Sequence, residues 1–202
     1  MTERVILASA SPRRAELLRQ LGLSFGTLPV DIDETAHSGE APADYVWRLA
    51  REKALAGYRR HDRPDALVLG SDTTVVLDDG ILGKPEDEAG ARRLLQSLSG
   101  REHQVMTGVA LATRDGVAVR VSVTDVRFRT LEPREIDAYC ATGEPLDKAG
   151  GYGIQGRGGA FVTAIRGSYS AVVGLPLDIT AGLLADAGLP VWNYWNSSTD
   201  GE

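Results

Sequence analysis

Segments patterned as strands and segments patterned as helices alternate along this chain, and this alternation restricts its fold more than any other feature. Expected strands lie at residues 5–8, 25–30, 66–77, 103–113 and 117–130, and expected helices at 12–21, 43–58, 87–98, 133–142 and 177–187. The last two strands are joined by an Arg-Asp-Gly turn, which predicts an antiparallel hairpin. Together these patterns predict an α/β protein with a mixed sheet flanked by helices.

The chain contains no stretch that reads as a linker between domains. Its 202 residues fit one domain, which we place at residues 1–190, and we expect the aromatic tail 191–202 to be partly disordered. Two local expectations complete the outline. Glycines should separate short strands within residues 150–165, and Gly70-Ser71-Asp72-Thr73 should interrupt the β-rich run 66–77.

Charge and cysteine content exclude several classes of function. The formal net charge of −6 does not favour nucleic acid or anionic membranes as partners. A single cysteine and three widely spaced histidines exclude a disulfide framework and argue against a zinc site. No signal peptide or membrane-spanning run is present, so we expect a cytoplasmic protein that is a monomer or a small oligomer such as a homodimer.

Lysine is rare: it accounts for three of the 22 basic residues, namely Lys53, Lys84 and Lys148. This rarity indicates positions where a compact ammonium group is required, although chance placement explains any single lysine equally well. The segment ILASASPRR at residues 6–14 places small hydroxyl residues and a Pro-started helix after a buried strand. This arrangement is typical of an anion site with Arg13 and Arg14 at its mouth, or simply of a capped helix with solvated arginines.

Acidic residues occur at two places that could carry chemistry. Asp72 interrupts an apolar run, where a carboxylate is usually paired with a cation, bound to a metal or used as a base; a turn aspartate is the alternative. The DIDET loop at 31–35 supplies carboxylates suited to Mg²⁺ or Mn²⁺, or is an ordinary solvated loop.

Six glycines fall within residues 147–159, around Gln155. This density permits a ligand to approach the backbone closely, and Gln155 could bond a base edge through its donor and acceptor, unless it is merely solvated. Basic residues, carboxylates and a glycine-rich segment together favour metal-assisted phosphoryl or nucleotidyl chemistry. A serine hydrolase is not favoured, because its G-x-S-x-G motif is missing. A glycosidase is not favoured, because its chemistry would leave the basic residues without a role.

Several motifs resemble, in order, those of the Maf family of nucleoside triphosphate pyrophosphatases. They cover roughly residues 4–189 and comprise SASPRR, VDIDET, RLAREKA, GSDTTVVLDDGILGKP, HQVMTGVAL, FRTLEPREI, GEPLDKAGGYGIQGRGGAFV and GSYSAVVGLPL. The resemblance implies an elongated α/β fold similar to that of inosine triphosphate pyrophosphatases. It also implies hydrolysis of a nucleoside triphosphate to monophosphate and pyrophosphate with a divalent cation.

The resemblance also assigns roles to individual residues. Asp72 matches the family's proton acceptor, and Glu34 with Asp72 would hold the metal. Phosphate binding is implied for Ser9, Arg13, Arg14, Lys53 and Lys84. Arg13, Thr73 and Gln155 match the subgroup associated with dTTP and UTP. The alternatives are 7-methyl-GTP pyrophosphatase activity and a nucleotide-binding regulator of septum formation without turnover.

Overall fold

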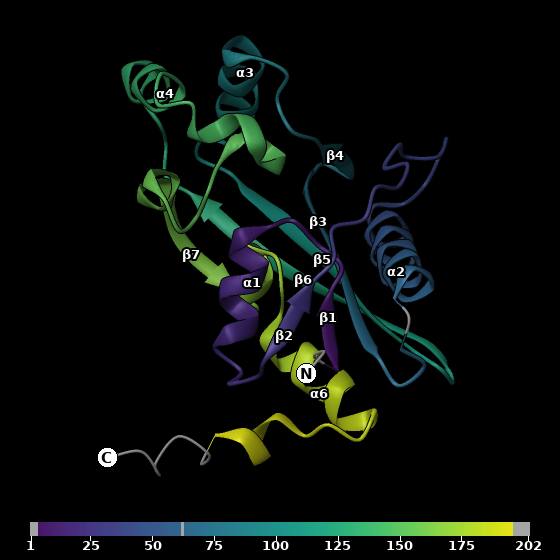
Figure 1. The fold of residues 1–202 in the computed structure, drawn as a ribbon. Helices are drawn as coiled ribbons and strands as arrows, with labels where there is room; N and C mark the ends of the chain where they lie inside the picture. The colour runs from purple at the N-terminus through teal and green to yellow at the C-terminus, as the bar shows by residue number, and fades with distance from the viewer. Residues whose placement is uncertain (1–3, 62, 196–202) are drawn as a thin grey trace. The chain divides into compact units, whose positions relative to one another are not determined.

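A computed structural model of the chain describes residues 4–61 and 63–195. Its strands are β1 (Val5–Leu7), β2 (Phe25–Thr27), β3 (Leu67–Leu77), β4 (Gly80–Leu82), β5 (Glu102–Thr113), β6 (Gly116–Phe128) and β7 (Val162–Arg166). Its α-helices are α1 (Pro12–Arg19), α2 (Pro42–Arg60), α3 (Glu88–Leu98), α4 (Pro133–Cys140), α5 (Tyr169–Val173) and α6 (Leu177–Asp186). The strands form one mixed sheet in the order β2-β1-β3-β5-β6-β7, with β4 paired to β3, which confirms the predicted α/β class (Figure 1).

The described residues divide into two compact units. Unit 1 comprises those within 1–72, 107–121 and 174–202, and unit 2 comprises 73–106 and 122–173. Three strands, β3, β5 and β6, contribute residues to both units. The single domain over residues 1–190 remains a prediction.

In unit 1, β1 lies between β2 and β3 and runs parallel to both. All three β1 residues are buried, as expected for a strand covered on both faces. The helix α1 begins as the sequence predicts: Ser11 is its N-cap and accepts a hydrogen bond from the Arg14 amide, and Pro12 occupies the first helical position.

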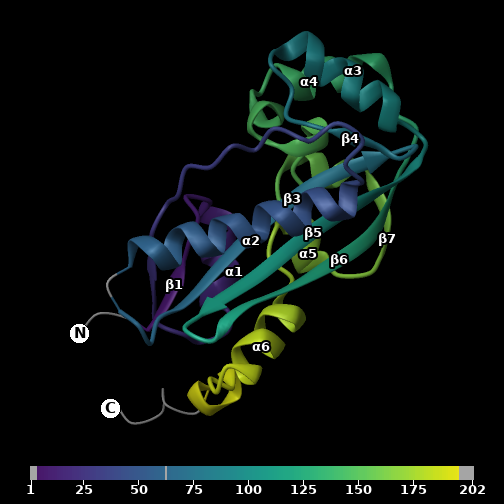
Figure 2. The same ribbon diagram turned by 90° about the vertical axis from the view of Figure 1, so that its right-hand side faces the viewer.

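Helix α2 lies directly against the unit 1 part of the sheet (Figure 2). A Cβ atom on Gly70 of β3 would overlap the backbone of Ala50 and Ala54, and one on Gly108 of β5 would overlap the carbonyl group of Val46. The prediction that residues 70–73 interrupt the strand is therefore wrong, because β3 is continuous from Leu67 to Leu77. Gly70 serves the close approach of a helix rather than a turn.

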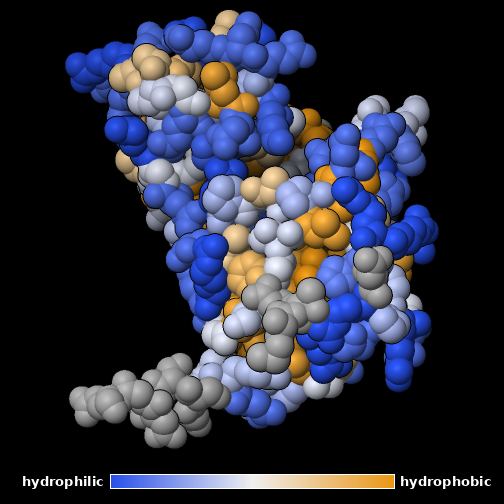
Figure 3. All heavy atoms as spheres, viewed as in Figure 1, coloured by the Kyte–Doolittle hydropathy of each residue, from blue (hydrophilic) through white to orange (hydrophobic). Residues whose placement is uncertain are grey.

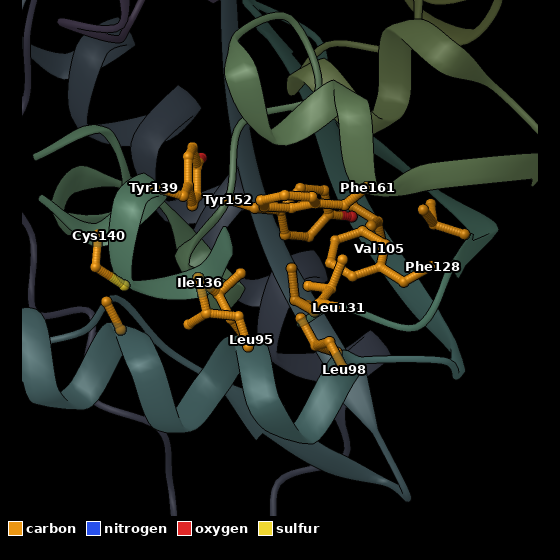
Figure 4. Packing of buried hydrophobic residues seen from close by; sticks show 13 residues of the cluster. Leu95, Leu98, Val105, Phe128, Leu131, Ile136, Tyr139, Cys140, Tyr152 and Phe161 are labelled. Atoms are coloured by element: carbon orange, nitrogen blue, oxygen red, sulfur yellow. The ribbon is translucent and has the colours of Figure 1, made fainter. Parts of the chain in front are cut away.

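In unit 2, α3 and α4 pack over a cluster of buried aromatic and aliphatic residues (Figure 4). His103 of β5 is 2% exposed; its Nε2 atom lies 2.8 Å from the Tyr152 hydroxyl, and its Nδ1 atom has no hydrogen-bond partner among the described residues. The rings of Phe128 and Tyr152 meet His103 edge to face. Burial lowers the pKa of His103 to about 4, so the ring is neutral at physiological pH.

The glycine-rich region differs from its prediction. Residues 150–165 were expected to form short strands, but the structure has two 3₁₀ helices there, preceded by a third and followed by the single strand β7. The three helices are η1 (Glu144–Asp147), η2 (Ala149–Gly151) and η3 (Arg157–Phe161). Glycine density permits tight turns of either kind, so the sequence did not distinguish the two. The short helix α5 was not predicted at all.

The aromatic tail begins with a fourth 3₁₀ helix, η4 (Val191–Tyr194), and Trp195 donates a hydrogen bond from its Nε1 atom to the carbonyl oxygen of Leu21. Residues 196–202 of the predicted partly disordered tail lie outside the described residues. Hydrophilic residues cover most of the face shown in Figure 3. Among the described residues, no helix combines the length and the apolar character needed to cross a bilayer.

Candidate active site

Asp72 lies on β3 beyond the point where the neighbouring parallel strand ends. Leu7, the last residue of β1, pairs with Leu69, so β3 continues past it toward Asp72 while the chain of β1 turns off through Ser9 into α1. The carboxyl ends of parallel strands are the usual place for ligands in such sheets. Asp72 is 7% exposed, which makes an unpaired carboxylate costly here.

The cation that pairs with Asp72 is Lys53 of α2. Its Nζ atom lies 2.7 Å from Asp72 Oδ1 and 2.6 Å from Glu34 Oε1, so one ammonium group bridges two carboxylates. Lys53 is 8% exposed. The close packing of α2 on Gly70 is what brings Lys53 to Asp72, two residues further along β3.

The acidic loop that carries Glu34 is held by the first turns of α2. The Tyr45 hydroxyl donates to the carbonyl oxygen of Glu34 at 2.9 Å, and Arg48 donates to that of Thr35 at 3.1 Å. Arg48 also makes a two-pronged ion pair with Glu40, at 2.6 and 2.8 Å, which lowers the pKa of Glu40 to about 2. Glu34 is thus fixed by its backbone, while about half of its side chain stays accessible.

The start of α1 supplies hydroxyl and guanidinium groups. Ser9 Oγ accepts hydrogen bonds from the Ser11 amide at 3.1 Å and from Arg14 Nη1 at 3.4 Å. Arg14 also donates from its Nε atom to the carbonyl oxygen of Gly174 at 2.9 Å, so its side chain is anchored at two points. A helix N-terminus with fixed donors of this kind suits an anion.

Electrostatic interactions connect the carboxylates of Asp72 and Glu34 with the guanidinium group of Arg14 at the start of α1. Burial lowers the pKa of Arg14, the charges of Asp72 and Glu34 oppose that effect, and the charge of Arg13 adds to it. The same two carboxylates, together with burial, raise the pKa of Tyr45 to about 12. Six of the predicted site residues therefore lie close enough to interact in unit 1: Ser9, Arg13, Arg14, Glu34, Lys53 and Asp72.

The other predicted site residues belong to unit 2. Thr73 follows Asp72 in β3 and is half-buried, and strand geometry directs the two side chains to opposite faces. Lys84 is exposed after β4. Gln155 is exposed in the turn between η2 and η3.

The carboxylates of Glu34 and Asp72 fit a divalent cation because they converge on one point. Mg²⁺ is usually held by one or two carboxylates together with substrate phosphates, and Glu34 and Asp72 already converge on a single positive group. Within residues 4–61 and 63–195, no cluster of three or more His, Cys, Asp or Glu side chains could hold a metal. A metal at this position would therefore need oxygen ligands from the substrate.

Two residues of this arrangement were not predicted from the sequence. Tyr45 and Arg48 were assigned no role, although Arg48 lies in the motif RLAREKA. Their function is visible only in the contacts that they make to backbone carbonyl groups of the acidic loop.

A separate cavity of about 560 Å³ lies elsewhere in unit 1. Its lining includes Arg4 at the start of β1, Leu67 at the start of β3 and Leu183 of α6. None of the predicted site residues lines it.

Comparison with known proteins agrees with the motifs that surround this site. The family described as Maf-like protein matches residues 4–187. The chain belongs to the Maf family. A relative named dTTP/UTP pyrophosphatase from Shewanella sp. (strain MR-7) is 57% identical over 191 residues, covering 92% of this chain and 98% of the relative. Another of that name, from Alcanivorax borkumensis, is 55% identical over 187 residues, covering 92% of this chain and 96% of the relative.

Solved structures outside the Maf family are similar at a lower level. The Ham1 protein of Staphylococcus aureus has a TM-score of 0.45 and 16% identity, covering 61% of this chain and 71% of that one. A nucleoside-triphosphatase, dITP/XTP pyrophosphatase, from Mycobacterium abscessus has a TM-score of 0.43 and 20% identity, covering 69% and 93%. Both scores are below 0.5, so membership of the Maf family rests on the family match over residues 4–187 and on the sequence relatives.

Proposed function

We propose that this chain is a nucleoside triphosphate pyrophosphatase that hydrolyses dTTP and UTP to the monophosphate and pyrophosphate. The observation that carries the proposal is the cluster in which the buried Lys53 bridges the buried Asp72 and the half-exposed Glu34, next to the anchored Arg14. The name shared by close relatives of the Maf family supports the choice of substrates.

In the proposed reaction, a water molecule attacks the α-phosphorus and Asp72 accepts its proton. A new bond forms between the water oxygen and the α-phosphorus, the bond from that phosphorus to the bridging oxygen breaks, and pyrophosphate leaves. Asp72 is placed for this task because its buried carboxylate is held by Lys53 at 2.7 Å, which gives the accepting oxygen atoms a fixed position. Ser9, Arg13, Arg14 and Lys53 would bind the phosphate oxygens.

A divalent metal ion, Mg²⁺ or Mn²⁺, is part of the proposal, with Glu34 and Asp72 as its protein ligands. When bound, it supplies charge neutralisation on the phosphate oxygens. Lys84 as a further phosphate ligand, and Thr73 and Gln155 as determinants of the base, remain predictions from the sequence. So do the cytoplasmic location, the homodimer and the absence of nucleic acid among its partners.

Asp72→Asn tests the proposal, because it preserves the shape of the side chain and removes its basicity. We expect kcat for UTP to fall by about a hundredfold or more, with KM nearly unchanged. Asp65→Asn is the matched control, since Asp65 is an exposed aspartate of unit 1 paired with Arg63. Full activity of Asp72→Asn would remove Asp72 from the role of base.

The substrate is tested by comparing dTTP, UTP, 7-methyl-GTP and GTP with Mn²⁺, with identification of the products. The proposal predicts pyrophosphate release from dTTP and UTP well above that from the two purine nucleotides. Preferential turnover of 7-methyl-GTP would support the other activity known in the family. Nucleotide binding without any pyrophosphate release would instead support the regulator.

A further inference from the structure

The glycine-rich turn that carries Gln155 is built around one carboxylate, that of Glu144 in η1. Glu144 Oε2 accepts a hydrogen bond from the Arg157 amide at 3.1 Å, and Oε1 accepts one from the Gly158 amide at 3.3 Å. Its side chain is only 16% exposed. These two bonds fix the backbone two and three residues after Gln155.

Tyr139 of α4 fixes the chain immediately before Gln155. Its hydroxyl donates to Glu144 Oε1 at 2.9 Å and accepts from the Gly153 amide at 3.1 Å. Its ring packs edge to face on Phe161 within the buried cluster of unit 2 (Figure 4), and this packing fixes the position of the hydroxyl. One Glu–Tyr pair therefore bonds both sides of the turn.

The glycines of this turn are explained by the same pair. A Cβ on Gly156 would overlap the carboxylate of Glu144, and a Cβ on Gly158 would lie 2.8 Å from the Tyr139 hydroxyl. Lys148, which follows η1, donates from its Nζ atom to the carbonyl oxygen of Glu144 at the start of η1, at 2.7 Å. The backbone thus wraps tightly around Glu144, while Gln155 is left exposed.

We infer that Glu144, together with Tyr139, is a positioning residue for Gln155 and thereby sets selectivity for the pyrimidine base. This inference rests on the proposed function and on the base-reading role predicted for Gln155. A glutamine can discriminate base edges only if its amide is held in one orientation, because a mobile amide can pair with almost any edge. The carboxylate contributes to that order by fixing the backbone from which the Gln155 side chain extends.

Glu144→Gln is the sharpest test, because it keeps size and shape. Both carboxylate oxygens face hydrogen-bond donors, so either orientation of the new amide sets its NH₂ group against a donor. We expect the ratio of kcat/KM for UTP to that for GTP to fall by about tenfold, mainly through KM for UTP. Tyr139→Phe should lower the same ratio, since it removes the hydroxyl and keeps the ring.

Two controls separate positioning from general loss of stability. Glu135→Gln alters another well-bonded glutamate of unit 2, which pairs with Arg129 at 2.7 and 2.9 Å and makes no hydrogen bond to residues 153–158, and should leave the ratio unchanged. In a double-mutant cycle, Glu144→Gln should add little to Gln155→Ala, because both act through one side chain.

The outcomes also separate this inference from the proposed function. A wild-type protein without preference for UTP or dTTP would contradict the proposed function. The positioning role would be overturned if the wild type is selective and the Glu144→Gln and Glu135→Gln variants have the same ratio of kcat/KM for UTP to that for GTP. Additive losses in the double-mutant cycle would overturn it as well.

Discussion

At the scale of single residues, the candidate site depends on Lys53, which serves two carboxylates at once. Removing a partner from a buried ion pair is costly, because the remaining charge is left without compensation. Apart from the family resemblance, the sequence drew attention to Lys53 only through the rarity of lysine, a signal compatible with chance. The structure supplies what the sequence lacked, namely two contacts of 2.6 and 2.7 Å.

Arg48 offers a prediction at this scale. Arg48→Lys should lose the two-pronged pair with Glu40 and the bond to the carbonyl oxygen of Thr35, because an ammonium group cannot reproduce the planar fork. We expect a loss of about 1–3 kcal/mol in the free energy of unfolding and a reduced kcat/KM, as the Glu34 loop loosens. Thermal unfolding and steady-state kinetics measure the two effects.

Arg63→Lys is the matched control for this prediction. Arg63 makes a similar two-pronged pair with Asp65, but on a more exposed part of unit 1. Its replacement should change stability little, since exposed pairs contribute little. Equal effects of the two substitutions would contradict a special role for Arg48.

At the scale of elements, the central relation is that between α2 and β3. The helical pattern of α2 and the β-type run of β3 were both evident in the sequence, and their bounds agree closely with the prediction. The close packing of α2 on β3 was not evident in the sequence, because a glycine in a strand indicates a turn as readily as a contact with a helix. For the same reason the sequence could not distinguish 3₁₀ turns from short strands among the glycines of residues 150–165.

Gly70→Ala tests this packing. The added methyl group must push α2 away from the sheet, so we expect a loss of about 3 kcal/mol in unfolding free energy. Because α2 carries Lys53, activity of the folded fraction should fall as well. Chemical denaturation combined with kinetics at low temperature measures both.

Gly182→Ala in α6 is the control for Gly70→Ala. A Cβ on Gly182 would meet no atom within 4 Å, and alanine favours a helix by up to about 1 kcal/mol. This variant should therefore be slightly more stable than the wild type. An equally stable Gly70→Ala protein would show that α2 does not need the space.

At the scale of the whole molecule, the buried His103 makes stability depend on pH. Because its pKa is lowered to about 4 in the folded state, the unfolded chain binds the proton more readily. Stability should therefore decline as the pH falls from about 6.5 toward 4, by about 2 kcal/mol at pH 5. Carboxylates with lowered pKa values, such as Glu40 and Glu135, add their losses only at lower pH.

His103→Gln should flatten this dependence, because an amide does not titrate. The quantity to compare is the change in unfolding free energy between pH 7 and pH 5, which cancels any constant cost of the substitution. An unchanged difference between the two pH values would exclude His103 as its cause.

Most of the arrangement in unit 1 was anticipated from residue types and from the resemblance to the Maf family. Ser9, Arg13, Arg14, Glu34, Lys53 and Asp72 were all named in advance, and the structure brings them together in unit 1, while the roles named for them remain predictions. Residues that act through backbone carbonyl and amide groups, such as Tyr45 and Glu144, escaped notice, because such contacts leave no distinctive residue pattern.

The ammonium group of Lys53 gives the two carboxylates an internal counter-ion. Newly synthesised chains can therefore fold without waiting for a divalent ion from solution. In the proposed reaction, scarcity of that ion would lower turnover and leave the amount of folded protein unchanged.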